Sequence, residues 1–155
     1  MPTLSVRPAT LVDLPHLASL FDSYRQFYEQ PPALEAATRF IRARMETGES
    51  TILVAEDTTA TTSSPLGFCQ LYPSFCSVEM APIFVLYDLF VTPAARGTGA
   101  GKALLLAAHD HAAAQGAKRL DLTTAKTNHT AQALYESLGW VRDEVFYAYN
   151  LRVKR

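Results

Sequence analysis

The residues best suited to chemistry lie in one glycine-rich stretch, Arg96-Gly97-Thr98-Gly99-Ala100-Gly101-Lys102. It follows a nearly all-apolar segment and precedes a segment of helical composition, which predicts a turn from a buried strand into a helix. Glycines let the backbone approach a ligand closely, and the first amides of a helix have no acceptor within it. The helix dipole, Arg96 and Lys102 add positive potential. The stretch therefore predicts an anion cradle, and a pyrophosphate is its natural ligand.

Two common nucleotide-binding motifs do not fit this turn. A P-loop has the pattern G-x-x-x-x-G-K-[ST], but Arg96 occupies the first glycine position and Ala103 follows Lys102. Without that hydroxyl to hold magnesium, nucleoside triphosphate hydrolysis is disfavoured. A dinucleotide fingerprint G-x-G-x-x-G would need its third glycine at Lys102 or Leu104, and it belongs in the first strand–helix unit of a fold. Here the turn lies in mid-chain.

The pattern that does fit is Arg-x-x-Gly-x-Gly at Arg96, Gly99 and Gly101, after a strand that ends Val-Thr-Pro. It resembles the pyrophosphate loop of the GNAT superfamily of N-acetyltransferases. A second segment, NHTAQALYESLGW (Asn128–Trp140), is similar to the downstream Asn, Tyr and Gly segment of that superfamily. The resemblance extends over nearly the whole chain. A plain glycine-rich turn between strand and helix is the alternative.

The resemblance implies acetyl-CoA as co-substrate and no metal. It implies that the strand Tyr87–Val91 splays from the next strand, Leu120–Thr124, with the pantetheine arm between them. Backbone groups of that strand would bind the pantetheine amides, and an N–H near Phe90 would polarise the thioester carbonyl. Asn128 would contact the cofactor, cap a helix, or do both. The implied cofactor contacts are Leu89, Phe90, Val91, Arg96, Gly97, Thr98, Gly99, Ala100, Gly101, Lys102, Asn128 and Tyr135.

Tyr135 is the candidate general acid. Coenzyme A leaves as a thiolate and needs a proton, and a phenol with a pKa of about 10 can donate one while staying protonated at neutral pH. Tyr135 also shares an apolar helix face with Ala131, Leu134 and Leu138, so periodicity alone assigns it to the core. The resemblance favours the catalytic role.

The general base is less well marked. Diamine-acetylating members of the superfamily carry a glutamate where this chain has Tyr87, followed by Asp88. Asp88 is the candidate base, acting through water; a structural Asp88 with an amine that arrives neutral is the alternative. The candidates for the acceptor pocket are Tyr24, Tyr28, Glu29, Glu79 and Tyr87. The first two also satisfy a core-face pattern.

The helices and strands that position these residues are predicted from the spacing of apolar residues and from the prolines and glycines that end each segment. Helices are expected around residues 14–28 and 34–47 and at Lys102–Gln115 and Thr130–Leu138. Strands are expected at Leu4–Arg7, Thr51–Glu56, Leu66–Tyr72, Ile83–Val91, Leu120–Thr124 and Val141–Val153. Pro73–Pro82 is expected to be a connection or an irregular edge. This order predicts an α/β fold, a single domain over residues 1–155, with a mixed, mostly antiparallel sheet of six to seven strands and about four helices on both faces.

The charge and hydropathy of the sequence disfavour two classes of binding partner, nucleic acids and membranes. A formal charge of −1 disfavours nucleic-acid binding, and no apolar run approaches the roughly eighteen residues of a membrane span. The N-terminus has no signal-peptide pattern, so a cytoplasmic protein is expected. Cys69 and Cys76 are expected to be buried free thiols. His109 and His111 are expected on different helix faces, one at the surface and one packed.

The function predicted is transfer of an acetyl group from acetyl-CoA to a primary amine of a small molecule, such as an amino acid or a polyamine. The stretch SYRQFYEQPP (Ser23–Pro32) and the glycine-rich segment resemble two subgroups, the yeast histone and D-amino-acid acetyltransferases and the diamine acetyltransferases. Acetylation of a protein or peptide tail and a non-catalytic acyl-CoA-binding module are the alternatives. A homodimer or a dimer of dimers is expected, with Phe146, Tyr147 and Tyr149 at the interface.

Overall fold

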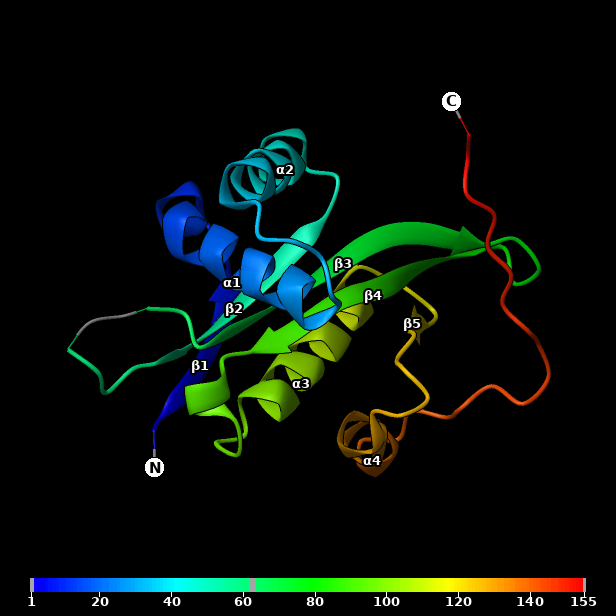
Figure 1. Ribbon diagram of the computed structural model, residues 1–155. Coiled ribbons are helices and arrows are strands. Elements are labelled where there is room, and N and C mark those ends of the chain that lie inside the picture. The colour runs from blue at the N-terminus through cyan, green and yellow to red at the C-terminus, as the bar shows by residue number, and fades with distance from the viewer. Residues whose placement is uncertain (1, 62–63, 155) are drawn as a thin grey trace. The chain divides into compact units, whose positions relative to one another are not determined.

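The computed structural model describes residues 2–61 and 64–154, which cluster into two units that divide after Thr123. The elements of the first unit are β1 (Leu4–Pro8), α1 (Leu14–Phe27), α2 (Leu34–Thr47), β2 (Thr51–Asp57), β3 (Gly67–Cys76), β4 (Ala81–Val91), α3 (Ala100–Ala114) and β5 (Leu120–Asp121) (Figure 1). The second unit contains α4 (His129–Ser137). No helix within the described part of the chain has the length and apolar character that a membrane span requires.

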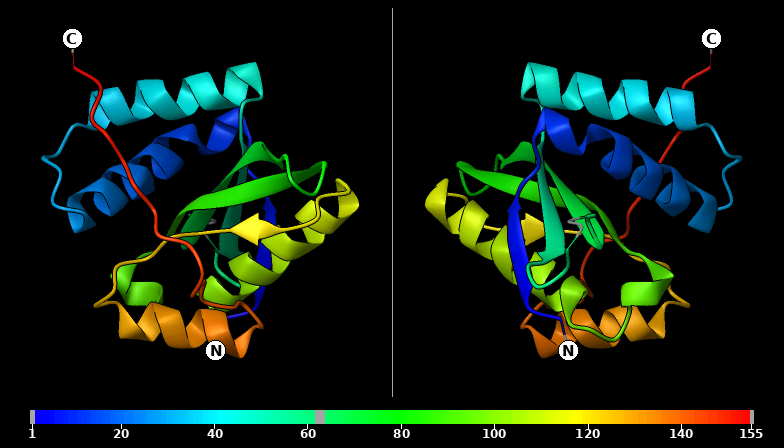
Figure 2. Two further views of the ribbon diagram at one scale, coloured as in Figure 1. Left: turned by 90° about the vertical axis from the view of Figure 1, so that its right-hand side faces the viewer. Right: turned by 90° about the vertical axis from the view of Figure 1, so that its left-hand side faces the viewer.

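The sheet of the first unit has the order β1-β2-β3-β4-β5. The pairs from β1 to β4 are antiparallel, and β4 pairs with β5 in parallel. Helices α1 and α2 cover one face and α3 covers the other (Figure 2). The prediction of a mixed, mostly antiparallel sheet between helices is confirmed.

Strand β2 shows why both faces are covered. Its side chains Ile52 and Val54 belong to a core cluster with Leu17 of α1 and Ile41 of α2. On the opposite face, the Thr51 hydroxyl lies 3.1 Å from Nε2 of His111 on α3. A strand buried on both faces reads as a continuous apolar run, and ILVA in this strand is such a run.

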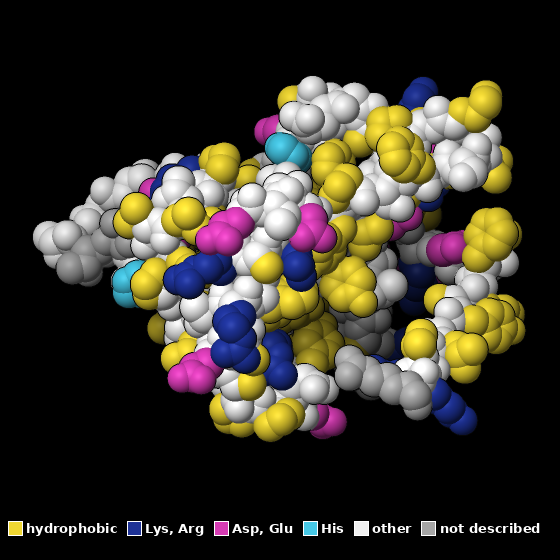
Figure 3. Space-filling model, turned by 90° about the horizontal axis from the view of Figure 1, so that it is seen from above, with side chains coloured by type: hydrophobic (Ala, Val, Ile, Leu, Met, Phe, Trp, Pro, Cys, Tyr) yellow, Lys and Arg dark blue, Asp and Glu magenta, His cyan; other side chains and the backbone are white. Residues whose placement is uncertain are grey.

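The side chains on the helical face of the first unit are mixed in charge. Lys, Arg, Asp and Glu side chains are interspersed with apolar ones over α1 and α2 (Figure 3). This distribution agrees with the formal net charge of −1. No extended field of one sign covers this face.

The predicted number of strands was wrong: the described residues form five rather than six or seven. Residues 141–153 form no strand, and Leu120–Thr124 contracts to Leu120–Asp121. A strand needs a partner for its backbone groups, and β-propensity alone does not supply one. Near the start of the segment, the Asp143 carboxylate accepts hydrogen bonds from the amides of Val145 (2.8 Å) and Phe146 (3.2 Å), a local turn that competes with strand pairing. Phe146, Tyr147 and Tyr149 are exposed.

The region Pro73–Cys76, predicted as a connection or irregular edge, is part of β3. Proline lacks an N–H and is tolerated in a strand only where that group would face no partner. The pairing of β3 with β2 ends at Leu71, whereas its pairing with β4 continues to Cys76. Pro73 therefore lies where β3 has a neighbour on one side only.

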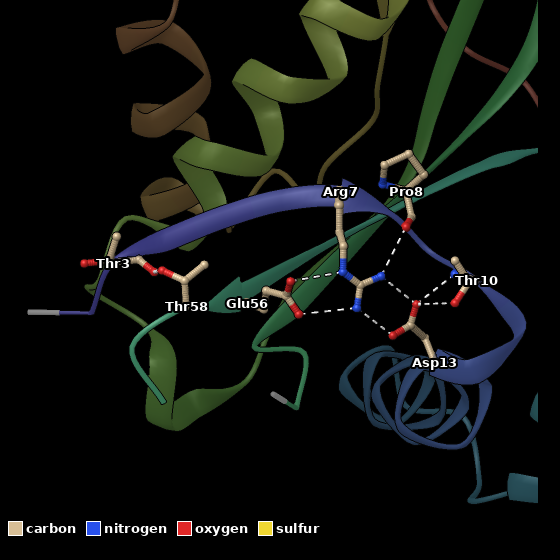
Figure 4. Close-up of polar contacts among 7 residues, drawn as sticks. All are labelled: Thr3, Arg7, Pro8, Thr10, Asp13, Glu56 and Thr58. Atoms are coloured by element: carbon tan, nitrogen blue, oxygen red, sulfur yellow. Dashed lines mark hydrogen bonds and ion pairs between the residues drawn. The ribbon is translucent and has the colours of Figure 1, made fainter. Parts of the chain in front are cut away.

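An ion-pair network joins β1, β2 and the start of α1 (Figure 4). The Arg7 guanidinium donates to both carboxylate oxygens of Asp13 at 2.8 Å and to Glu56 Oε1 at 3.0 Å. The Asp13 carboxylate also accepts from the backbone amide of Thr10 at 2.7 Å, which caps this end of the helix. The hydrogen bonds from Arg7 lower the pKa of Asp13 to about 2.

Replacing Asp13 with Asn should destabilise the fold by about 1–2 kcal/mol at pH 7, because the paired carboxylate has a lower pKa in the folded chain than the value of about 3.9 expected when unfolded. The sign follows from the lowered pKa: the stabilisation is fully present above about pH 4 and is lost as the pH falls towards about 2. Urea unfolding from pH 7 to pH 2 measures it. The control Asp110→Asn changes an exposed carboxylate on α3, and an equal effect there would contradict the prediction.

Candidate active site

The glycine-rich turn has the geometry of an anion cradle. A short 3-10 turn, Pro93–Ala95, is followed by Gly97 with a φ of 81° and Gly99 with a φ of 91°, and α3 begins at Ala100. These φ values favour glycine. The amide of Ala103 donates to the carbonyl of Gly99 at 2.9 Å, which is the first hydrogen bond of the helix. The amides just before Ala103 therefore have no acceptor in the helix and are available to phosphate oxygens.

Two side chains of the turn hold its shape. Arg96 Nε donates to the carbonyl of Val91 at 3.2 Å, and its guanidinium lies 5.7 Å from the centre of the Phe90 ring. The Thr98 hydroxyl donates to the carbonyl of Ala95 at 2.5 Å. Arg96 thus braces the turn against β4, and the backbone amides and the exposed Lys102 stay the predicted anion contacts.

The edge of β4 next to this turn has unpaired backbone groups. Thr92 donates to the carbonyl of Leu66 at 2.9 Å, towards β3, and backbone groups alternate in direction along a strand. The backbone N–H and C=O groups of Phe90 therefore point towards β3, whereas those of Leu89 and Val91 point to the opposite side. On that side β5 pairs only with Phe84 and Val85 among the described residues. An N–H near Phe90 that meets a ligand must belong to Leu89 or Val91.

A bulge in β4 places two adjacent side chains on one wall. Gln70 of β3 pairs with Asp88 and Leu71 pairs with Leu86, so Tyr87 has no partner in the register. Neighbouring residues of a regular strand point to opposite faces, and a bulge breaks that alternation. Tyr87 and Asp88 both line the same cavity.

Asp88 is a buried carboxylate, 5% exposed, that is held in a hydrogen-bond network. Gln70, itself fully buried, donates from Nε2 to Asp88 Oδ2 at 2.7 Å and accepts from the Ser50 hydroxyl at 2.7 Å. Burial raises the pKa of Asp88, and the hydrogen bonds from Gln70 and Tyr24 partly offset this. Tyr24 also donates to the carbonyl of Tyr87 at 3.1 Å.

The cavity beside Asp88 has a volume of about 580 Å³. Half of its lining residues are aromatic, and they come from α1, α2, β3 and β4. The lining residues are Phe21, Phe40, Tyr72, Pro73, Ser74, Val85, Tyr87 and Asp88. Burial and the charge of Asp88 raise the pKa of Tyr72 to about 12.

The structure brings together only part of the predicted acceptor set. Tyr87 lines the cavity, and Tyr24 packs its ring against Phe68 at 5.9 Å and against Phe90 at 6.2 Å. Tyr28 is exposed, with its ring 5.2 Å from that of Tyr24. The remaining two carboxylates lie outside the lining set. Glu29 is exposed after α1, and Glu79, in the β3–β4 connection, pairs with Arg119 at 3.3 Å.

Sequence reasoning missed Gln70, Phe40 and Tyr72. Gln70 carried a signal, because a lone amide in the apolar strand FCQLY must find partners when buried. Phe40 and Tyr72 carried none. Their place on the cavity wall depends on how α2 and β3 pack across the sheet.

The second unit contains the other predicted residues. Asn128 accepts a hydrogen bond from the amide of Ala131 at 3.2 Å and caps α4. Tyr135 lies half-buried on α4, with its ring 6.0 Å from that of Trp140. The roles of both residues toward the cofactor stay predictions.

The histidines lie as predicted, whereas the prediction of two buried thiols is confirmed for Cys69 and wrong for the partly buried Cys76. His109 is exposed, and His111 packs its ring 5.4 Å from Phe84. Cys69 and Cys76 are both free thiols, although only Cys69 is fully buried. The described residues include no group of His, Cys, Asp and Glu that could hold a metal ion.

Comparison with known proteins identifies the class. The model of the Acetyltransferase (GNAT) family matches residues 17–140, and the chain belongs to this family. The chain is 45% identical over 150 residues to the uncharacterized N-acetyltransferase YhfO of Bacillus subtilis, covering 97% of this chain and 98% of the relative. It is 29% identical over 133 residues to the D-amino-acid N-acetyltransferase HPA3 of Saccharomyces cerevisiae, covering 84% and 81%.

The fold agrees with this assignment. It matches the crystal structure of a probable acetyltransferase with a TM-score of 0.89 and 35% identity, over 97% of this chain and 99% of the other. The family uses acetyl-CoA, and the chain is an N-acetyltransferase. The resemblance read from the glycine-rich loop is confirmed, and the non-catalytic alternative is set aside.

Replacing Gly99 with Val should abolish measurable acetyl-CoA binding, because the branched side chain occupies the space of the phosphate and the φ of 91° strains it. Isothermal titration measures the affinity. Gly116→Val is the matched control: Gly116 also has a positive φ, 75°, with open space around it, but lies at the far end of α3. Loss of affinity in both variants, or in neither, would contradict the assignment of the loop.

Proposed function

We propose that the chain transfers the acetyl group of acetyl-CoA to a primary amine of a small molecule held in the cavity beside Asp88. The observation that carries this proposal is a buried carboxylate on the wall of a cavity that is open to solvent and half lined by aromatic residues. The volume of about 580 Å³ lies in the range of small-molecule sites, roughly 300–1,000 Å³. Acetylation of a peptide tail would need an extended groove, which this set of lining residues does not favour.

The residues suggest a direct transfer. Asp88 takes a proton from the bound ammonium, directly or through water, and its raised pKa makes it a better base than an exposed aspartate. The amine nitrogen then attacks the carbonyl carbon of the thioester, while an N–H of Leu89 or Val91 stabilises the oxyanion. The carbon–sulfur bond breaks, and the thiolate takes a proton from Tyr135. Because Tyr135 lies in the second unit, the proposal needs both units in one catalytic domain, as predicted.

Replacing Tyr135 with Phe should lower kcat by about a hundredfold or more, the usual contribution of a general acid. Release of coenzyme A thiol from acetyl-CoA with an amine panel measures kcat, and titration measures acetyl-CoA affinity, which should change little. Tyr147→Phe, an exposed tyrosine of the same unit, is the control. Equal turnover in Tyr135→Phe would remove this residue as the acid.

Replacing Gln70 with Met should move the acid limb of the pH profile of kcat/KM to higher pH. The hydrogen bond from Gln70 lowers the pKa of Asp88, so its loss raises that pKa, and the base is then protonated at a higher pH. Ser50→Ala is the control, because it removes the partner of Gln70 Oε1 and leaves the donor to Asp88. An unmoved acid limb in Gln70→Met would indicate that Asp88 is not the base.

A further inference from the structure

The cavity offers one negative charge. Asp88 is the only carboxylate among its lining residues, and the other polar groups there are the hydroxyls of Tyr72, Ser74 and Tyr87. An ammonium group that leaves water needs a charged partner, whereas a hydroxyl supplies only a neutral hydrogen bond. The cavity therefore has one carboxylate for an ammonium group and no second carboxylate among its lining residues.

Glu49, an acid close enough for its charge to act on Tyr72, is already paired. Glu49 lies 3.4 Å from the Arg44 guanidinium and accepts from the Thr47 hydroxyl. Arg44 in turn lies 4.4 Å over the ring of Phe40, a wall residue, and places a positive charge behind that wall. The charge of Glu49 is therefore already compensated by a cation of the chain itself.

The rest of the wall suits an apolar body. The rings of Phe21 and Phe40 stack at 5.6 Å with an angle of 9° between their planes. The rings of Tyr72 and Tyr87 meet edge to face at 5.8 Å. Flat surfaces of this kind gain most from apolar or aromatic groups, and their attraction for a cation is weaker than that of a carboxylate.

We infer that the acceptor is a monoamine, with one ammonium group carried on an apolar or aromatic body, and not a polyamine. This inference rests on the proposed function, which places the acceptor in this cavity. Asp88 binds the ammonium group, and the rings of Phe21, Phe40, Tyr72 and Tyr87 contact the body.

Thiol release with pentylamine, phenethylamine and cadaverine tests the inference. Pentylamine and cadaverine share a five-carbon chain and differ in the second amine of cadaverine. The kcat/KM for pentylamine and phenethylamine should exceed that for cadaverine by about tenfold or more, since the second ammonium group would be desolvated without a partner. An equal or higher value for cadaverine overturns the inference and leaves the proposed function standing.

A designed carboxylate gives a second test. Ser74 is exposed and lines the cavity, so Ser74→Glu should be tolerated and should supply the missing partner. It should raise kcat/KM for cadaverine about tenfold relative to pentylamine, by one added charge pair. Ser74→Gln has the same size without the charge and should leave the ratio unchanged. The same ratio in Ser74→Glu and Ser74→Gln contradicts the inference.

If no amine releases thiol although acetyl-CoA binds, the proposed function fails, and equilibrium dialysis of the same amines then decides the occupant of the cavity. Retention of pentylamine or phenethylamine over cadaverine that is lost in Asp88→Asn supports the inference. Equal retention of cadaverine, or retention of none of the amines, overturns it.

Discussion

The burial of Asp88 is the constraint on which the rest of this site depends. A carboxylate that leaves water must be held by hydrogen bonds or it will take up a proton. Gln70 supplies the main donor, and because Ser50 donates to Oε1, the amide must present its Nε2 to Asp88. Strands β3 and β4 and the residue just before β2 thus each contribute one member of the network.

The bulge at Tyr87 connects the acceptor cavity with the cofactor edge. Before the bulge, the amide of Phe84 donates to the carbonyl of Arg119, on the β5 side; after it, the amide of Thr92 donates to Leu66, on the β3 side. Both residues have even numbers, so one extra residue has reversed the alternation between them. Without it, Leu89 and Val91 would direct their backbone groups into the pairing with β3. One inserted residue therefore exposes the backbone for a ligand and brings Asp88 beside Tyr87.

Features that depend on contacts between residues close in the sequence could be predicted, whereas features that depend on tertiary packing could not. The glycine-rich turn could be predicted because its glycine spacing and helix start are local, and the positions of β1 to β4 along the chain followed from apolar runs and turns. Residues 141–153 were wrongly assigned because strand formation depends on a partner, whereas the turn at Asp143 needs only hydrogen bonds within the segment. Phe40 and Tyr72 could not be assigned to the cavity wall, since α2 and β3 bring them to it only in the folded chain. Gln70 lay between these cases: its burial was predictable, but its partner Asp88 was not.

The electrostatics of the cavity and its aromatic wall are linked. Asp88 is buried, whereas Tyr87 beside it is 68% exposed and can turn its neutral hydroxyl towards solvent. Aromatic neighbours lower the local dielectric constant, which strengthens the attraction between Asp88 and a single cation and also raises the cost of any charge without a partner. The same environment raises the pKa of Asp88, so its negative charge is most stable when a cation is bound or when Gln70 donates to it. A wall that makes Asp88 an effective base is for this reason also a wall that selects against a second positive charge.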